Sequence, residues 1–293
     1  MSRKISIKTA AALGSALLGS AAAVSAVGAT AFFRYLNRPE RYTPLPTDVK
    51  NINLIAHRGM SSLAPENTSV AFELAGENGF WGAECDIYRS IDGRWLLSHD
   101  PNTFRMMNKA AKIEKKTYDY LMQLSVNRGS EIEKYPDLKI CTLEEYLDIC
   151  KKYNMAAIIE IKGKNNSEHY SEVVSAVESR GVSAIYISFH FEDLKKMREF
   201  TDAPLYLLVG DIKREHILLV KTLENCGIDF FAGRASVFKN GFVQKCLEEG
   251  IDLIAWTVNE PELLEKIVAL GVKNITTDRI YIENEAAGEP VGE

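Results

Sequence analysis

The residues whose types suit chemistry at phosphorus are two histidines, one arginine and two carboxylates, each at or near the end of a short apolar segment. They are His57, Arg58, Glu84, Asp86 and His99. In a strand, residues two positions apart project from the same face, so Glu84 and Asp86 are expected to point the same way. A pair of imidazoles can move protons near neutral pH, while carboxylates bind a cation and arginine neutralises a phosphoryl group. The pattern therefore predicts metal-assisted attack at phosphorus.

A third carboxylate repeats this geometry further along the chain. Glu160 and Lys162 stand two apart in the otherwise apolar segment 158–162. A carboxylate within a buried strand costs several kcal/mol unless it is paired or binds a metal. Three carboxylates with one nearby lysine favour one divalent cation held by oxygen ligands, Mg²⁺, Ca²⁺ or Mn²⁺. The alternative is two plain ion pairs, one joining Glu84 to Arg58 and one joining Glu160 to Lys162.

Apolar, β-branched segments alternate with segments of helical spacing over most of the chain, which predicts an α/β fold. Eight strands and a parallel sheet favour a closed (β/α)8 TIM barrel, in which active sites form where strands end. An open doubly wound sheet is the alternative, but no G-x-G-x-x-G sequence follows the first strand. Strands are expected at 52–57, 83–88, 156–161, 184–189, 204–209, 228–232, 251–257 and 273–277. Helices are expected at 68–78, 142–153, 168–180, 191–200, 214–226, 240–249 and 260–270.

One interval interrupts this alternation. Residues 101–140 are rich in lysine and lack a clear strand, although aromatic residues and methionines occur among them. Loops of this length in a compact domain are usually functional or form a small insertion. We expect a lid-like insertion after the second strand, with an ordinary surface excursion as the alternative.

Charge is unevenly distributed along the 293 residues. Residues 1–43 hold six Lys/Arg and one acidic residue, whereas the remainder holds 29 basic and 39 acidic residues. Without a basic stripe to follow a phosphate backbone, nucleic acid is not an expected partner. The five cysteines form no C-x-x-C pair, so we expect free thiols, mostly in the core.

The N-terminal region has the composition of a membrane segment. Residues 1–8 are basic, and the 25 residues 9–33 carry no charge, which is long enough for a single-pass transmembrane helix. Aromatic and basic residues at its end suit a membrane interface, although small-residue sites at 24–29 would also fit a cleaved signal peptide. Three basic residues flank each side, so the side of the membrane stays open. Residues 34–50 are expected to be a linker and 286–293 a tail.

A set of motifs makes the resemblance to a known family specific. His57-Arg58-Gly59, Pro65-Glu66-Asn67-Thr68, Glu84-x-Asp86, His99-Asp100, Thr142-Leu143-Glu144-Glu145, Glu160-x-Lys162 and Trp256-Thr257-Val258-Asn259 occur in order. Their order and spacing resemble those of the glycerophosphodiester phosphodiesterase (GDPD) family. The resemblance implies a TIM barrel over 51–285 and metal-dependent hydrolysis of glycerophosphodiesters to sn-glycerol 3-phosphate and an alcohol. The chain differs in Thr277-Asp278-Arg279-Ile280, where the family usually has proline after Asp-Arg.

The resemblance also implies a role for each motif position. His57 and His99 would be the general acid/base pair; Glu84, Asp86 and Glu160 would bind the metal; Arg58 and Lys162 would contact the phosphoryl oxygens; and Trp256 would wall the glycerol pocket. Two further substrate classes stay open with the same barrel, lysophospholipids and a cell-envelope phosphodiester. A catalytically silent barrel that binds phospholipid headgroups is the alternative from another functional class.

Overall fold

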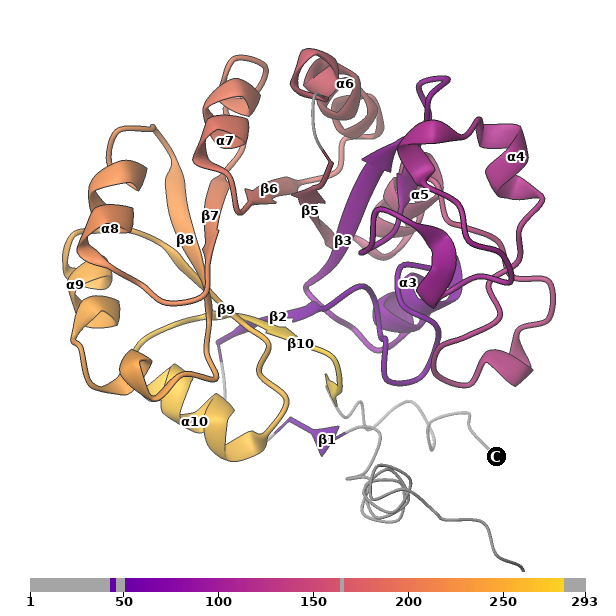
Figure 1. Ribbon diagram of the computed structural model, residues 1–293. Helices are drawn as coiled ribbons and strands as arrows, with labels where there is room; N and C mark the ends of the chain where they lie inside the picture. Colours follow the sequence, from indigo (N-terminus) through magenta and orange to yellow (C-terminus); the bar gives the residue numbers. More distant parts are fainter. Residues whose placement is uncertain (1–42, 46–50, 164–165, 282–293) are drawn as a thin grey trace, which may run out of the picture. The chain divides into compact units, whose positions relative to one another are not determined.

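The structure is a computed structural model, and it describes residues 43–45, 51–163 and 166–281. Eight parallel strands form its centre, with helices on the outside of the ring (Figure 1). The first strand of the ring, β2, pairs with both β3 and β10, so the sheet closes and the doubly wound alternative is wrong. The strands are β2 (Asn53–Ala56), β3 (Gly82–Arg89), β5 (Ala156–Ile161), β6 (Ala184–Ser188), β7 (Leu205–Val209), β8 (Cys226–Phe231), β9 (Leu253–Trp256) and β10 (Asn274–Thr277). All eight predicted strands are confirmed.

The helices between the strands also agree with the predicted segments. They are α3 (Ser69–Glu77), α5 (Leu143–Tyr153), α6 (Tyr170–Arg180), α7 (Phe191–Arg198), α8 (Arg214–Val220), α9 (Phe242–Glu248) and α10 (Pro261–Ala269). Thr142 and Glu145 form a reciprocal capping box that starts α5. Helix α8 is shorter than predicted and ends at Val220, because Asn225 is in a left-handed conformation and β8 already begins at Cys226.

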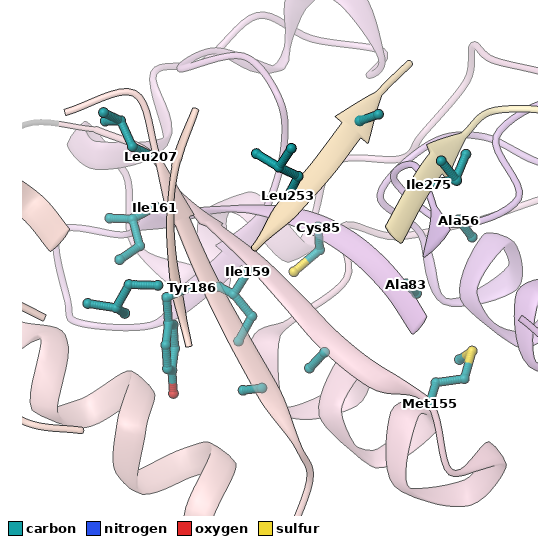
Figure 2. Packing of buried hydrophobic residues seen from close by; sticks show 14 of the residues in the cluster. Ala56, Ala83, Cys85, Met155, Ile159, Ile161, Tyr186, Leu207, Leu253 and Ile275 are labelled. Carbon is teal, nitrogen blue, oxygen red and sulfur yellow. The ribbon is translucent and has the colours of Figure 1, made fainter. Parts of the chain in front are cut away.

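Strand residues alternate between two apolar layers. Outward-facing side chains, among them Cys85, Ile159, Tyr186 and Leu207, pack in the cluster shown in Figure 2, to which helix residues also belong. Inward-facing residues such as Ile158 form a second cluster within the barrel. This period of two places Glu84, Asp86 and Glu160 on the inward face, with the polar residues above an apolar floor.

The interval 101–140 is an insertion with a small core of its own. It follows β4 (Trp95–Leu97), which pairs antiparallel with β3, and contains η1 (Thr103–Arg105), η2 (Ile113–Lys115), α4 (Tyr118–Met122) and η3 (Ile132–Lys134). Its core contains Leu96, Ile113, Leu121 and Val126. The insertion is therefore packed around its own apolar side chains and is anchored beside β3 and β4.

Two findings concern the ends of the chain. The expected linker 34–50 contains β1 (Thr43–Pro44), which pairs with β11 (Ile280–Tyr281), so this part of it belongs to the folded unit. The expected membrane segment 9–33 lies outside the described residues. Among the helices that the structure describes, none has both the length and the apolar character needed to span a bilayer. The five cysteines are free and four of them are buried, as predicted.

Candidate active site

The predicted site residues come together where the barrel strands end. They surround one cavity of about 90 Å³, called here the mouth cavity. Its lining includes His57, Arg58, Glu84, His99, Glu160, Lys162 and Trp256. The one predicted residue outside this lining, Asp86, lies in the carboxylate cluster with Glu84 and Glu160. Residues from β2, β3, β5 and β9, more than 190 positions apart in sequence, thus share one site.

The three carboxylates form a buried cluster. Glu84, Asp86 and Glu160 are 3%, 0% and 8% exposed, and each offers an oxygen within 4.8 Å of the others. The β3–β5 register places Asp86 opposite Glu160, while Glu84 stands two residues earlier on β3. Oxygens on opposite sides of a bound ion are about 4 Å apart for Mg²⁺ and about 5 Å for Ca²⁺. The separation and the all-oxygen donor set fit a hard divalent cation.

Two basic side chains balance part of this charge. Lys162 Nζ lies 2.7 Å from Glu160 Oε1 and 3.2 Å from Asp86 Oδ1. Arg58 Nε lies 3.4 Å from Asp86 Oδ2. The expected pair of Glu160 with Lys162 is therefore present, but the Arg58 guanidinium pairs with Asp86 and not with Glu84. When all three carboxyl groups are ionised, the two basic side chains leave one negative charge in the cluster uncompensated.

The close approach of the three carboxyl groups affects their pKa values. Burial and the neighbouring Asp86 raise the pKa of Glu84 well above its usual range. Burial and Asp86 also raise the pKa of Glu160 to about 8, although Lys162 opposes the shift. For Asp86, burial is outweighed by Lys162 and Arg58, which hold its pKa below its usual range. A divalent cation among the three would favour the ionised form of all of them.

The turn after β2 has a left-handed backbone at Arg58 and Gly59. Arg58 has φ 57°, and its backbone N–H donates to Glu84 Oε2 at 2.9 Å. Gly59 has φ 77°, and a Cβ at that position would lie 2.7 Å from the backbone carbon of Ala71. Only glycine fits there, because both the left-handed conformation and the close approach of helix α3 exclude a side chain. The turn places His57 and Arg58 over the carboxylate cluster.

Asn67, from the Pro65-Glu66-Asn67-Thr68 motif, fixes the orientation of Asp86. Its side-chain amide donates to Asp86 Oδ2 at 2.8 Å, and its carbonyl oxygen accepts from the Asp86 backbone N–H at 3.1 Å. Thr68, the next residue, caps helix α3. Two adjacent residues of the motif therefore position the Asp86 carboxylate and start helix α3.

Each histidine is held by a carboxylate at Nδ1. His57 Nδ1 lies 2.7 Å from Asp278 Oδ1, and His99 Nδ1 lies 2.9 Å from Asp100 Oδ1. An ionised carboxylate only accepts hydrogen bonds, so the Nδ1 atom of each histidine donates. The Nε2 atom is then free to exchange a proton with a ligand. His57 Nε2 is 4.0 Å from Glu84 Oε2. Burial lowers the pKa of His99, which favours its neutral form near neutral pH.

Supporting residues that sequence reasoning did not assign complete the site. Asp100 also accepts from Arg105 Nε at 2.6 Å, and both terminal nitrogens of Arg105 donate to Glu66. Glu66 in turn accepts from Arg58 at 3.0 Å. Glu66 and Asp100 stood in recognised motifs, but no sequence pattern marked Arg105, which the insertion contributes. The insertion therefore takes part in positioning both His99 and Arg58.

On the side of β8 and β9 the mouth cavity is lined by one aromatic side chain, Trp256, and one acid, Asp229. The Trp256 ring packs against Phe231 at 5.3 Å and Phe189 at 6.0 Å between ring centroids. Asp229 lines the same cavity and is 2% exposed. Burial raises the pKa of Asp229 well above its usual range. Sequence reasoning missed this residue, although an acid inside the apolar segment 228–232 was a visible signal.

Comparison with known proteins places this geometry in a family. Residues 57–282 match the family model described as "Glycerophosphoryl diester phosphodiesterase family". The chain is 28% identical over 238 residues to human glycerophosphodiester phosphodiesterase 1, covering 71% of this chain and 72% of that one. It is 27% identical over 233 residues to the glycerophosphodiester phosphodiesterase of Caldanaerobacter subterraneus, covering 77% of this chain and 93% of that one.

A solved structure agrees with the same assignment. The phosphodiesterase of Oleispira antarctica, solved in complex with its product sn-glycerol-3-phosphate, superposes with a TM-score of 0.70 at 26% identity. The match covers 77% of this chain and 92% of that one. With a family model that spans most of the chain and the expected motifs around one cavity, the chain belongs to the glycerophosphoryl diester phosphodiesterase family.

Proposed function

We propose that this protein hydrolyses glycerophosphodiesters to sn-glycerol 3-phosphate and an alcohol, with one divalent cation and two histidines as general acid and base. The observation that carries the proposal is the convergence of three buried carboxylates and two imidazoles on one cavity. Family membership supports the reaction class. The cation is Mg²⁺, Ca²⁺ or Mn²⁺, since the donors are all carboxylate oxygens.

Glu84, Asp86 and Glu160 would hold the cation, which when bound supplies positive charge to the phosphoryl oxygens. Arg58 and Lys162 neutralise the remaining charge that develops on those oxygens in the transition state. Both side chains line the cavity, and the carboxylates beside them keep their nitrogen atoms in fixed positions. A substrate phosphodiester with one negative charge then meets an electrostatically complementary site.

We infer that the first nucleophile is the 2-hydroxyl of the substrate's own glycerol. One histidine takes the proton of this hydroxyl as its oxygen bonds to phosphorus, and the other gives a proton to the departing alkoxide. Water then opens the resulting cyclic phosphate with the two proton transfers reversed. Each transfer is worth about 10²–10⁴ in rate. Trapping the cyclic phosphate by phosphorus NMR supports this order, whereas labelled water entering the first product without such a species contradicts it.

Product identification tests the proposed function. The full-length protein is incubated with glycerophosphocholine, and the phosphorus products are identified by NMR. The proposal predicts sn-glycerol 3-phosphate and choline. Phosphocholine and glycerol as products would contradict the cleavage position, and binding of glycerophosphocholine without turnover would favour the catalytically silent alternative.

Lysophospholipids form a second candidate substrate class, favoured by a groove of about 440 Å³ that shares Phe189 and Leu208 with the mouth cavity. Phe191 and Leu219 add apolar surface to it, while Lys213 and Arg234 add positive charge. Rates for lysophosphatidylcholine and glycerophosphocholine, measured side by side, separate the two classes. A higher kcat/KM for the acylated substrate would favour a lysophospholipase D-like activity.

For residues 9–33 we propose a single-pass membrane anchor, on the basis of their length and lack of charge. The anchor would hold the site near lipid-derived substrates. Fractionation of the full-length protein tests this. Recovery in the membrane pellet after a carbonate wash supports an anchor, and recovery of a shortened, water-extractable chain indicates a cleaved signal peptide.

A further inference from the structure

Two residues that line the mouth cavity on the side of β8 and β9 each carry a buried polar atom without a hydrogen-bond partner. The atoms are Oδ1 of Asp229 and Nε1 of Trp256. Among the residues that the structure describes, neither atom has a hydrogen-bond partner. Buried polar atoms in folded proteins are nearly always hydrogen-bonded, so two such atoms on residues that line one cavity need an explanation.

The residues beside Asp229 on the neighbouring strands are apolar. Its neighbours across the sheet are Leu208 on β7 and Ile254 on β9, both buried in the barrel's inner apolar cluster. An apolar residue of similar size would be more favourable there, because burying an unpartnered carboxyl opposes folding. Asp229 therefore does not stabilise the fold by itself. Its position fits a residue whose hydrogen-bond partner is supplied by a bound ligand.

The two atoms together specify the chemistry of that ligand. An indole N–H only donates a hydrogen bond, whereas the carbonyl oxygen of a carboxyl group accepts one whether or not the group is ionised. A hydroxyl satisfies both at once, by accepting from Trp256 and donating to Asp229. The strand order places β8 four positions from β3 in either direction around the closed ring, so this pair lies across the barrel from Glu84 and Asp86. A ligand held at the carboxylate cluster by its phosphate would reach the pair with its far end.

We propose that Asp229 and the Trp256 indole N–H bind the terminal hydroxyl of the substrate's glycerol and thereby determine specificity for glycerol diesters. This inference rests on the proposed function. The glycerol 2-hydroxyl, next to the phosphate, stays at the histidines, and only the terminal hydroxyl extends to the opposite wall. Asp229 is thus a specificity-determining residue, and the ring of Trp256 covers the carbon chain.

The test uses two diesters that differ in this hydroxyl alone, glycerophosphocholine and 2-hydroxypropyl phosphocholine. The wild-type protein is expected to favour the glycerol diester by at least about 10²-fold in kcat/KM, since a site that binds a hydroxyl rejects an analogue without it. Asp229→Leu is expected to bring this ratio close to one while turnover of the propanediol diester persists. Asp229→Asn, whose amide can still accept a hydrogen bond, is expected to keep part of the preference, and Trp256→Phe to lose part of it.

Glu144→Gln is the matched control. Among the described residues Glu144 also has a buried side-chain oxygen without a hydrogen-bond partner, but it lies on helix α5 and lines neither the mouth cavity nor the adjacent groove. The control is expected to keep the wild-type ratio. An Asp229→Leu protein that discriminates as the wild type does would overturn the proposal, and so would a wild type with equal kcat/KM for the two diesters.

Binding measurements separate this inference from the proposed function. Calorimetry compares sn-glycerol 3-phosphate with propane-1,2-diol 1-phosphate, which lacks the terminal hydroxyl, for wild type and Asp229→Leu. If the wild type binds the deoxy ligand more weakly than sn-glycerol 3-phosphate, and Asp229→Leu does not, the result supports the proposed hydroxyl contacts. Absence of turnover alongside this result would contradict only the proposed function. Turnover of glycerophosphocholine with no discrimination in rate or binding would contradict only the pair.

Discussion

The imidazole of His57 and the carboxylate of Asp278 continue the β2–β10 ladder by one residue. Thr277 pairs with Ala56 in the register of these strands, and the next residues on each strand meet with 2.7 Å between Nδ1 and Oδ1. Asn259 donates to the other oxygen of Asp278 at 2.7 Å. Burial would raise the pKa of Asp278, but the hydrogen bond and charge of His57 outweigh it and lower this pKa to about 2. The closing strand of the barrel thus fixes the ring orientation and tautomer of His57.

Replacing Asp278 by asparagine should therefore lower kcat by about 10²-fold or more, with little change in KM. An asparagine amide can donate to Nδ1 and leave the proton on Nε2, which is the wrong tautomer for a base. The measurement is kcat and KM for glycerophosphocholine, recorded as a pH–rate profile. Asp278→Glu should recover part of the rate.

Glu260→Gln provides the control for this region, since Glu260 is exposed and pairs only with Arg279 among the described residues. It should leave the rate and the profile unchanged. Equal activity of Asp278→Asn and wild type at every pH would remove the positioning role of Asp278.

The two histidines are predicted to be individually essential. His57→Ala and His99→Ala should each reduce kcat by at least about 10²–10⁴-fold, because each loses one proton transfer. Both side chains are partly exposed at the cavity, so the thermal unfolding midpoint should change little. His169→Ala serves as the control, because His169 is half-exposed and pairs with Glu172 away from the cavity. Near-normal turnover by either site variant would reject the role of that histidine.

Arg105 should affect activity more than stability. The insertion places it between Asp100 and Glu66, which hold His99 and Arg58. Arg105→Ala should lower kcat/KM by about 10-fold through misplacement of these two groups. As its side chain is 42% exposed, the free energy of unfolding should change by no more than about 1 kcal/mol.

Arg180→Ala is the corresponding control, since Arg180 forms an ion pair of the same length with Asp148 on the outer helices. A similar, small loss of stability with unchanged kcat/KM is expected there. If Arg105→Ala and Arg180→Ala were equally active, the insertion would have no part in positioning the site.

Without a cation, the protein should become less stable as the pH rises from 7 to 8. Glu160 has a pKa of about 8 in the folded protein and near its ordinary value of 4.5 when unfolded. Between these values the folded state binds more protons than the unfolded state, so the free energy of unfolding falls as pH increases. Denaturant unfolding of cation-depleted protein measures this slope. Glu160→Gln should reduce the slope, and a saturating cation should abolish it; an unchanged slope in Glu160→Gln would contradict this origin.

The fold was largely predictable because apolar segments of period two and of period about 3.6 alternate from Asn53 to Thr277, apart from the insertion at 101–140. The carboxylates Glu84, Asp86 and Glu160 were predictable for the same reason, since an acid in such a strand must face a site. Closure of the sheet could only be inferred from the strand count, because pairing of the first strand with the last is a long-range contact.

The supporting residues were less accessible to sequence reasoning. Asp278 stands 221 positions from His57, and their contact depends on the register of two strands that only the closed barrel brings together. Arg105 lies in a segment without regular apolar periodicity, so no sequence pattern predicted which way its side chain points. Asp229 was visible as an acid among apolar residues, but its lack of a partner follows only from the packed barrel.

The cation requirement of turnover tests the central claim most directly. Purified full-length protein is depleted with a chelator, and hydrolysis of glycerophosphocholine is followed as Mg²⁺, Ca²⁺ or Mn²⁺ is added back. If Glu84, Asp86 and Glu160 hold the ion, depletion should reduce the rate by at least about 10²-fold, one of the ions should restore it, and Asp86→Asn should need at least about 10-fold more of that ion. A depleted protein that hydrolyses glycerophosphocholine at the undepleted rate would contradict the account.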